Sequence, residues 1–315
     1  MDIIFLDQNK WIDLARIHTG KDKAPARQAL LEELKAAVTN GKVIFPLTVA
    51  HILETSKRND PKSRAHLAEV QTALSKGYVF RSRKARLLLE MRSALKRLFS
   101  EPEIELPQHW AIVPGFMQAF EHFDEMGAQP NEAKRTRFLN QHIDPKVQLY
   151  DYLVGQDDTS RRAAHQMYAS ESDALVTRIE DRRKLWSTVT PAVRERAYAA
   201  RLFFDHQGYV AHELEAIGHS VDEMKALGGS ALIQFMAEVP TFAIEVALSV
   251  SLEKQSRPIH ANDIRDMHSF CSAIPYALRL IAENTFVTLA LQSKLDSRYG
   301  CNISTKLDDL SGLYI

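Results

Sequence analysis

The sequence has little of several features that would point to particular classes of protein. Its two cysteines, Cys271 and Cys301, are too few for a disulfide framework. Lys and Arg together number 40, as do Asp and Glu, so the net charge does not indicate a partner of either sign. The chain has no repeat, no glycine-rich phosphate loop and no Gly-x-Ser-x-Gly motif. These absences argue against a disulfide-rich domain, a P-loop enzyme and a serine hydrolase.

A leader peptide and a membrane span are also not indicated. The chain starts with a strand-like pattern and lacks a basic-then-apolar leader, so we expect no signal peptide. The most apolar stretch, 231–250, contains Gln234, Glu238, Pro240 and Glu245, which favours a buried helix pair over a membrane span. We therefore expect a cytoplasmic protein without membrane contact.

Both ends of the chain show the alternation of strands and helices that is typical of an α/β fold. The apolar run 3–6 is short and uninterrupted, as in a strand buried on both faces of a parallel sheet. The patterns predict further strands over 42–45, 278–282 and 301–305, with 78–80 as a strand or a linker, and helices from 10 and over 26–38, 47–54, 59–75, 259–273 and 285–291.

Helical periodicity dominates the middle of the chain, where 163–180 and 190–217 are the longest expected helices. The sequence therefore predicts a discontinuous α/β domain over 1–82 and 255–315. A large all-helical insertion of unknown role, 83–254, would separate the two halves of its sheet. In this arrangement the two halves meet in space.

Acidic side chains fall at the ends of the expected strands. Asp7 follows the first strand directly, where open α/β sheets place their ligands, although an acid there could also simply cap the next helix. The other candidates are Glu54 after the second strand, Asp263 and Asp266 on the 259–273 helix, and Glu283 and Asn284 after the strand 278–282. In a parallel sheet such positions can converge on one rim. Oxygen ligands of this kind suit Mg²⁺ or Mn²⁺, and paired ions can hydrolyse phosphodiesters.

At these positions the sequence resembles the PIN-domain nucleases. Leu6-Asp7-Gln8-Asn9 is similar to that family's opening Asp-x-Asn motif, and the stretch from Phe45-Pro46 to Glu54 is similar to its second motif. The stretch from Asn262 to His268, followed by Pro275-Tyr276, resembles its Asp-bearing helix, and the stretch from Leu280 to Asn284 resembles the strand end with its fourth ligand. The resemblance covers about 1–60 and 258–310.

The resemblance implies a doubly wound, mainly parallel PIN-like sheet and a metal-dependent endoribonuclease. Proteins similar to this family cut RNA, less often DNA, with Mg²⁺ or Mn²⁺, and many are toxins of toxin–antitoxin pairs or act in RNA processing or phage defence. Asp7, Glu54 and Asp266 would then be the principal ligands. Asp263, Glu283 and Asn284 would assist them.

One departure from the family pattern supports an alternative. Relatives often carry an acid after the Pro-Tyr pair, where this chain has Ala277-Leu278. A weakened PIN-like module that binds nucleic acid or a protein partner without cutting is therefore the second hypothesis. A cognate protein inhibitor and a homo-oligomer are further possible partners.

Basic residues could serve either hypothesis. Lys57, Arg58 and Lys62 follow Glu54 closely and could hold RNA, or single-stranded DNA, although a solvated surface explains them as well. The longer stretch 57–97 contains twelve Lys or Arg and three Asp or Glu, which is compatible with a polyanion-binding face or with solvated helices.

Four other residues receive structural expectations. We expect Asn9 to support the site by bonding Asp7 or the local turn. His51 and His268 are expected to be structural or surface histidines, and Trp11 a core residue.

Overall fold

The computed structural model describes residues 1–185 and 189–314, without the side chains of 164, 165 and 167–171. The chain forms two compact units. Unit 1 consists of 1–82, 111–171 and 272–315, and unit 2 of 83–110 and 172–271. These bounds differ from the predicted ones, because 111–171 belongs with the sheet-containing unit and 255–271 does not.

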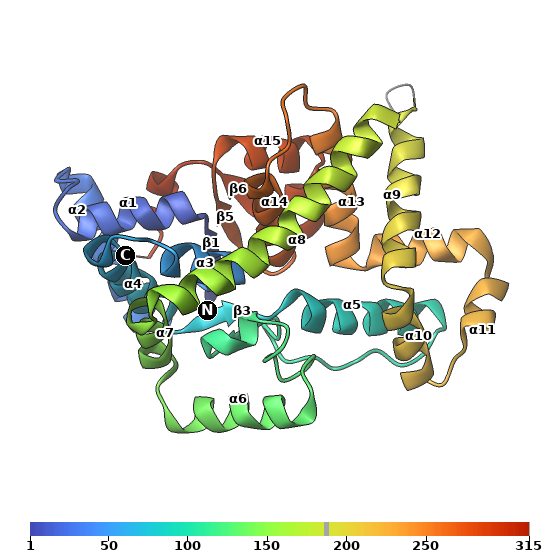
Figure 1. Cartoon of the computed structure of the whole chain (residues 1–315), viewed down its shortest axis with the longest axis horizontal. Coiled ribbons are helices and arrows are strands. Elements are labelled where there is room, and N and C mark those ends of the chain that lie inside the picture. The colour runs from blue at the N-terminus through green and yellow to red at the C-terminus, as the bar shows by residue number, and fades with distance from the viewer. Residues whose placement is uncertain (186–188, 315) are drawn as a thin grey trace. The chain divides into compact units, whose positions relative to one another are not determined.

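The central sheet of unit 1 has four parallel strands in the order β2-β1-β5-β6 (Figure 1). They are β1 (Asp2–Leu6), β2 (Val43–Ile44), β5 (Arg279–Ile281) and β6 (Asn302–Ser304). The predicted parallel α/β sheet is confirmed, and its two halves do come from opposite ends of the sequence. Ile3, Ile4, Phe5 and Leu6 are at most 2% exposed, as a strand covered on both faces requires.

The order of the strands places a topological switch point between β1 and β5. From β1 the chain first adds β2 on one side, and much later adds β5 and β6 on the other. In open α/β sheets, ligands bind outside the carboxyl ends of the strands at such a point. The side chains that follow β1 and β5 are therefore the first candidates for a site.

A second, two-stranded sheet corrects the expectation that 83–254 is all helical. Strand β3 (Tyr78–Phe80) pairs antiparallel with β4 (Ile112–Pro114), and β4 lies inside that range. Three residues are too few to show a period of two, so the sequence pattern did not reveal β4.

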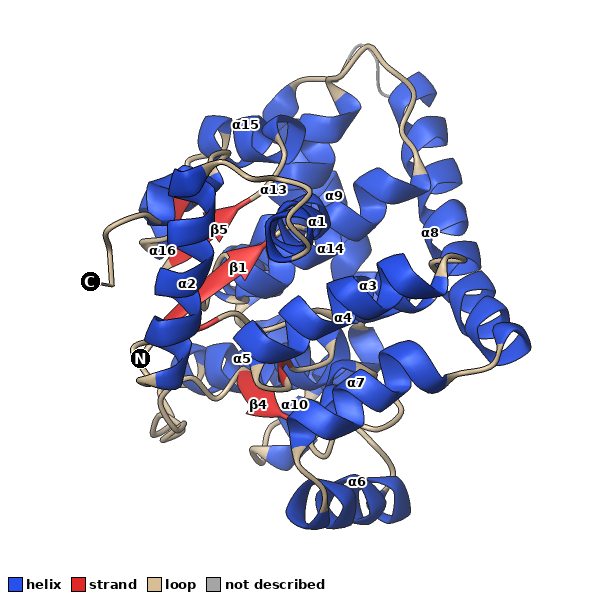
Figure 2. Ribbon diagram, turned by 90° about the vertical axis from the view of Figure 1, so that its left-hand side faces the viewer, coloured by secondary structure: helices blue, strands red, loops and turns tan. Residues whose placement is uncertain are grey.

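Helices and 3₁₀ turns surround these sheets in unit 1 (Figure 2). They are α1 (Gln8–His18), α2 (Pro25–Thr39), α3 (Val49–Ser56), α4 (Pro61–Ser75), η1 (Phe116–Ala119), α6 (Pro130–His142), α7 (Pro145–Gly155), α15 (Asn284–Gln292), α16 (Leu295–Tyr299) and η2 (Leu307–Leu310). Helix α1 packs on β1 and on α4. Its Trp11 is fully buried, so the expectation of a core role is confirmed.

Unit 2 is built from helices. They are α5 (Arg83–Leu98), α9 (Pro191–Asp205), α10 (Gln207–Ala216), α11 (Val221–Ala226), α12 (Gly228–Glu238), α13 (Pro240–Glu253) and most of α14 (Ala261–Ala273). The predicted helix 163–180 lies within α8 (Asp158–Leu185), which runs from one unit into the other. The predicted helix 190–217 is two helices, because the chain turns at His206.

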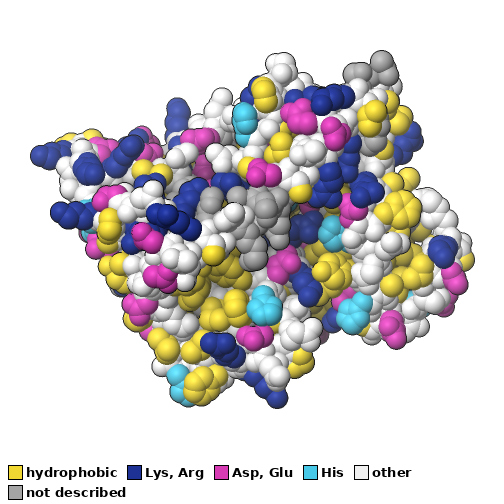
Figure 3. Space-filling model, in the orientation of Figure 1, with side chains coloured by type: hydrophobic (Ala, Val, Ile, Leu, Met, Phe, Trp, Pro, Cys, Tyr) yellow, Lys and Arg dark blue, Asp and Glu magenta, His cyan; other side chains and the backbone are white. Residues whose placement is uncertain are grey.

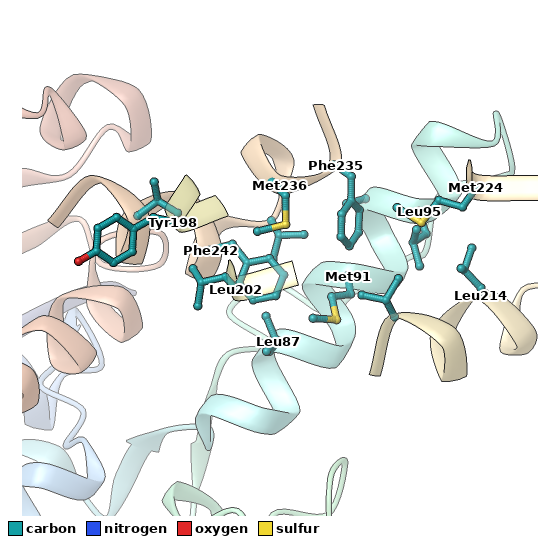
Figure 4. Close-up of a cluster of buried hydrophobic side chains, with 14 of the residues drawn as sticks. Leu87, Met91, Leu95, Tyr198, Leu202, Leu214, Met224, Phe235, Met236 and Phe242 are labelled. Atoms are coloured by element: carbon teal, nitrogen blue, oxygen red, sulfur yellow. The ribbon is translucent and has the colours of Figure 1, made fainter. Parts of the chain in front are cut away.

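One apolar cluster holds these helices together (Figure 4). Leu87 and Met91 of α5 point toward Phe235 and Met236 of α12 and toward Phe242 of α13. All five side chains are at most 4% exposed, so they form the core of unit 2.

No single helix among the described residues is long and apolar enough to span a bilayer. Helices α12 and α13 meet the length and composition test only as a pair, bent by 90°. In unit 2 most of α13 is buried, but only Phe235 and Met236 of α12 are, so the predicted buried helix pair is confirmed for α13 alone.

Candidate active site

Asp7 and Glu283 lie side by side at the carboxyl ends of β1 and β5. Leu6 pairs with Ile281, and the Asp7 backbone N–H donates to the Ile281 carbonyl at 2.9 Å. One Asp7 carboxylate oxygen, Oδ2, accepts the backbone N–H of Glu283 at 3.3 Å. Two acids distant in sequence are thus brought together at the switch point of the sheet.

Asp7 also caps helix α1. Its Oδ1 accepts the Gln8 backbone N–H at 2.6 Å, and its carbonyl accepts the N–H groups of Lys10 and Trp11. The helix-capping role considered for Asp7 is therefore real. It does not exclude a functional role, because the same carboxylate also contacts the β5 strand end.

Glu283 is exposed, and its side chain is held by Asn9. The Asn9 amide group donates to the Glu283 carboxylate, so the predicted supporting residue contacts Glu283 rather than Asp7. The two residues come from the first turn of α1 and from the start of α15. This hydrogen bond orients Glu283 beside Asp7.

The electrostatics of Asp7 reflect this crowding. Burial raises the pKa of Asp7, hydrogen bonds from the Gln8 and Glu283 backbone oppose the shift, and the charge of Glu283 adds to it. The outcome is a pKa above its ordinary value of 3.8. A cation placed against both carboxylates would remove this repulsion.

Glu54 lies half-buried on α3, in a segment adjoining the start of α1. The next residue, Thr55, accepts a hydrogen bond from the Gln8 side chain at 3.1 Å, and Gln8 directly follows Asp7. A side-chain hydrogen bond therefore connects α3, which carries Glu54, to α1, which Asp7 caps.

Asn284 is oriented differently from Glu283. It is the first residue of α15, and its Oδ1 accepts from the Thr288 hydroxyl at 3.4 Å along the same helix. This contact turns the amide oxygen along α15. Of the two polar residues that follow β5, Glu283 is the one in contact with Asp7.

Asp263 and Asp266 lie on α14 in unit 2. Both Asp263 oxygens contact the Arg257 guanidinium, at 2.6 and 2.8 Å, and one also accepts the His260 N–H. Burial alone would raise its pKa, but Arg257 and His260 hold the pKa of Asp263 below its ordinary value. These contacts describe an acid that belongs to the start of a helix, which was the alternative to metal ligation for Asp263. Asp266 is half-buried one turn later on the same helix.

The basic residues after Glu54 have different surroundings. Lys57 and Lys62 are exposed, whereas Arg58 is half-buried and donates to the Ser63 hydroxyl at 3.3 Å. In the part of the 57–97 stretch that belongs to unit 2, Arg83, Arg92 and Arg97 pair with Glu245, Glu213 and Glu238. Three of the six basic residues in 83–97 are therefore paired with acids of their own unit.

The two histidines meet their structural expectations. His51 is buried, its ring accepts the Thr48 N–H at 3.1 Å, and burial lowers its pKa to about 3. Burial likewise lowers the pKa of the partly buried His268 to about 4. Neither is suited to proton transfer near neutral pH.

The donor set at the strand ends fits a hard divalent cation. Among the described residues, no three His, Cys, Asp or Glu side chains form a group that could hold a metal ion. Mg²⁺ commonly uses one or two protein carboxylates and keeps several water ligands. The neighbouring carboxylates of Asp7 and Glu283 meet that requirement.

Sequence reasoning missed the contacts that organise this region. The Asn9–Glu283 and Gln8–Thr55 hydrogen bonds join residues that are 274 and 47 positions apart, and no local sequence pattern predicts them. Comparisons with protein-family models, with curated proteins and with solved structures found no match to this chain.

Proposed function

We propose that this protein is a PIN-like endoribonuclease that depends on Mg²⁺ or Mn²⁺. The observation that carries the proposal is the contact between Asp7 and Glu283 at the switch point between β1 and β5. A buried acid beside a second negative charge is costly without a cation, since burial and the charge of Glu283 raise the Asp7 pKa despite the opposing backbone hydrogen bonds.

In this proposal Asp7 is the principal cation ligand at the strand ends, and the family resemblance implies Glu54 and Asp266 as further ligands. Glu283 assists Asp7, and Asn9 keeps Glu283 in place through its hydrogen bond. Asp263 positions the start of α14 through Arg257 and His260. Asn284, whose amide faces Thr288, is secondary. When bound, the cation supplies positive charge against the phosphate as charge develops on its oxygens.

The chain's own residues orient the site and bind the substrate. The Gln8 and Glu283 N–H groups each donate to one oxygen of Asp7, and each oxygen keeps a further lone pair for a cation. Lys57 and Lys62 are exposed cations close in sequence to Glu54, where they can contact the phosphate backbone of a strand. No side-chain nucleophile is required, because water is the attacking group.

A nucleic-acid-binding module that does not cut is the second candidate. It is favoured by Leu278, which is 46% exposed at the position where an acid is expected in related nucleases. Salt-dependent RNA binding without cation-dependent turnover is the behaviour it predicts.

The test is cleavage of single-stranded RNA with Mg²⁺ or Mn²⁺. We expect the wild type to cut, and Asp7→Asn, Glu54→Gln and Asp266→Asn each to lose roughly a hundredfold or more in rate. Asp309→Asn is the matched control, because Asp309 is an exposed acid elsewhere in unit 1. Calorimetry with Mn²⁺ should show binding that Asp7→Asn removes.

Two outcomes would count against the nuclease. Equal cleavage by wild type and Asp7→Asn would assign the activity to a contaminant or another site. No cleavage with any RNA, together with intact RNA binding, would favour the binding module. A toxin role adds one expectation: expression should arrest growth in the wild type but not in Asp7→Asn.

A further inference from the structure

A basic pocket lies beside helix α1 in unit 1, away from the acidic strand ends. It has a volume of about 180 Å³, enough for several water molecules. Its polar lining comes from α1 and the turn after it, and from the start of α4 and the residues before it: Arg16, Thr19, Lys21, Arg58, Ser63 and His66. Figure 3 shows Lys and Arg side chains gathered over α1 and α2, at the left of the view.

The charge of the pocket has one sign. Arg16, Lys21 and Arg58 bring three cations, and none of the described lining residues is acidic. Two acids lie close in sequence: Asp60 caps α4 by accepting the Ser63 N–H at 2.9 Å, and Asp13 offsets part of the charge of Arg16, with which it pairs at 3.4 Å on an exposed surface. The net charge of these five groups favours an anion.

Two buried arginines hold the Arg58 backbone in place. Arg64 and Arg161, 6% and 2% exposed, both donate to the Arg58 carbonyl, and Arg161 also donates to the Ser56 carbonyl at 2.6 Å. The Arg58 side chain then reaches Ser63 at 3.3 Å. Since the Ser63 hydroxyl accepts in that bond, its own proton remains to be donated to a ligand.

The turn after α1 brings Lys21 back beside Arg16. Gly20 has a φ of +67°, and the Lys21 N–H donates to the Arg16 carbonyl at 2.9 Å. The last carbonyls of α1 already receive N–H donors from the backbone of 19–22 and from Gln28. The cationic side chains of Arg16 and Lys21 are therefore not required there as helix caps.

We propose that this pocket binds a phosphate monoester group. A monoester carries a charge of about −1.5 to −2 and three acceptor oxygens, which matches three cations and a hydroxyl donor. Its two possible sources are the 5′-terminal phosphate of an RNA strand and a small free phosphate. Arg16 lies eight residues along α1 from Gln8, about 12 Å, so the pocket is distinct from the Asp7 site. The proposal goes beyond the nuclease and does not require it.

The experiment measures binding in EDTA, where a nuclease that requires a divalent cation is inactive. The probes are inorganic phosphate and a short oligoribonucleotide with either a 5′-phosphate or a 5′-hydroxyl, all at one ionic strength. The variants are Lys21→Gln and Arg58→Gln, with Lys23→Gln as the matched control, because Lys23 is exposed and does not line the pocket.

We expect Lys21→Gln and Arg58→Gln each to weaken phosphate binding about tenfold or more, and Lys23→Gln to leave it unchanged. If the 5′-phosphate tightens RNA binding with the same dependence on the variants, the strand end is the source. If only inorganic phosphate shows that dependence, a small phosphate is the source.

The proposal is overturned if neither probe binds, or if the variants and the Lys23→Gln control bind equally well. Lys21 is exposed, so its variant keeps the fold and remains informative even if Arg58→Gln is destabilised. A failure of the nuclease proposal would appear in the assays that use a divalent cation or growth, not in EDTA, and therefore cannot be confused with either result.

Discussion

The carboxylate of Asp7 accepts the backbone N–H of Glu283 at 3.3 Å, across 276 positions of sequence. This bond joins the cap of the first helix to the end of a strand close to the other end of the chain. It gives the acidic pair a fixed geometry before any ligand arrives.

Replacing Asp7 by Asn should change how stability depends on pH. Because the Asp7 pKa is raised in the folded protein, its contribution is most favourable below about pH 3.8 and is lost as the pH rises through the folded pKa. Asn caps helices as well as Asp does. We therefore expect Asp7→Asn to raise the melting temperature in EDTA at pH 7 by a few degrees at most, and the gain to shrink toward pH 4. A lower melting temperature of the variant at pH 7 would show that the ionised Asp7 carboxylate does not destabilise the folded protein.

The hydrogen bond from Asn9 should matter more than the side chain of Asn284. Asn9→Ala leaves Glu283 without its partner, so we expect a loss of about 10- to 100-fold in cation affinity or in cleavage rate. Stability should change by less than about 0.5 kcal/mol, because Asn9 is exposed. Asn284→Ala is the matched control and should have a smaller effect, because its amide oxygen faces Thr288. An equal loss of cation affinity or cleavage rate in both variants would indicate that Asn284 is also a cation ligand.

His51 should make the protein sensitive to acid. Its pKa is lowered from 6.5 to about 3, so the stability it contributes above pH 6.5 is lost as the pH falls toward 3. The slope is about 1.4 kcal/mol per pH unit for each proton taken up. In His51→Gln, glutamine can still accept the Thr48 N–H of the capping box, so the variant should unfold with a shallower pH dependence between pH 6 and 4. Denaturant titrations at several pH values measure this slope, and an unchanged slope would contradict the assignment.

The core of unit 2 should depend on Phe235. It is 1% exposed within the cluster of Figure 4, so Phe235→Ala should lower the free energy of unfolding by about 3–5 kcal/mol. Phe204→Ala is the control, since Phe204 is 61% exposed on α9, and it should cost less than about 1 kcal/mol. Hydrogen exchange at the α5 and α12 amides reports the difference. Equal protection in the two variants would mean that the cluster is not the core.

The sheet could be predicted from sequence because its signals are local. The run from Ile3 to Leu6 is apolar without interruption, and β5 has two buried apolar residues, Leu280 and Ile281, whereas β6 has only Ile303. Acids follow β1 and β5 closely, so Asp7 and Glu283 could both be selected before their contact was known. The strand order of the sheet, which places β1 beside β5, then brings Asp7 and Glu283 together.

The remaining features depend on packing that no period in the sequence encodes. The role of Asp263 was left open because Arg257, its partner, lies in the loop before α14, outside any helical spacing. The basic pocket needs α1 to lie on α4, and this pairing is set by the shape of the two helix surfaces. The compact units differ from the predicted boundary at 254/255 for a related reason: helical periodicity describes helices, and does not report which unit they join.

The position of β1 between β2 and β5 has a consequence for synthesis on the ribosome. Residues 44 and 279 are 235 positions apart (279 − 44), a stretch that takes roughly 10 to 50 s to translate. During that interval one edge of β1 has no neighbour in its sheet, and Asp7 has no Glu283 beside it. Whatever chemistry the acidic pair performs is therefore withheld from the nascent chain until Glu283 has been synthesised.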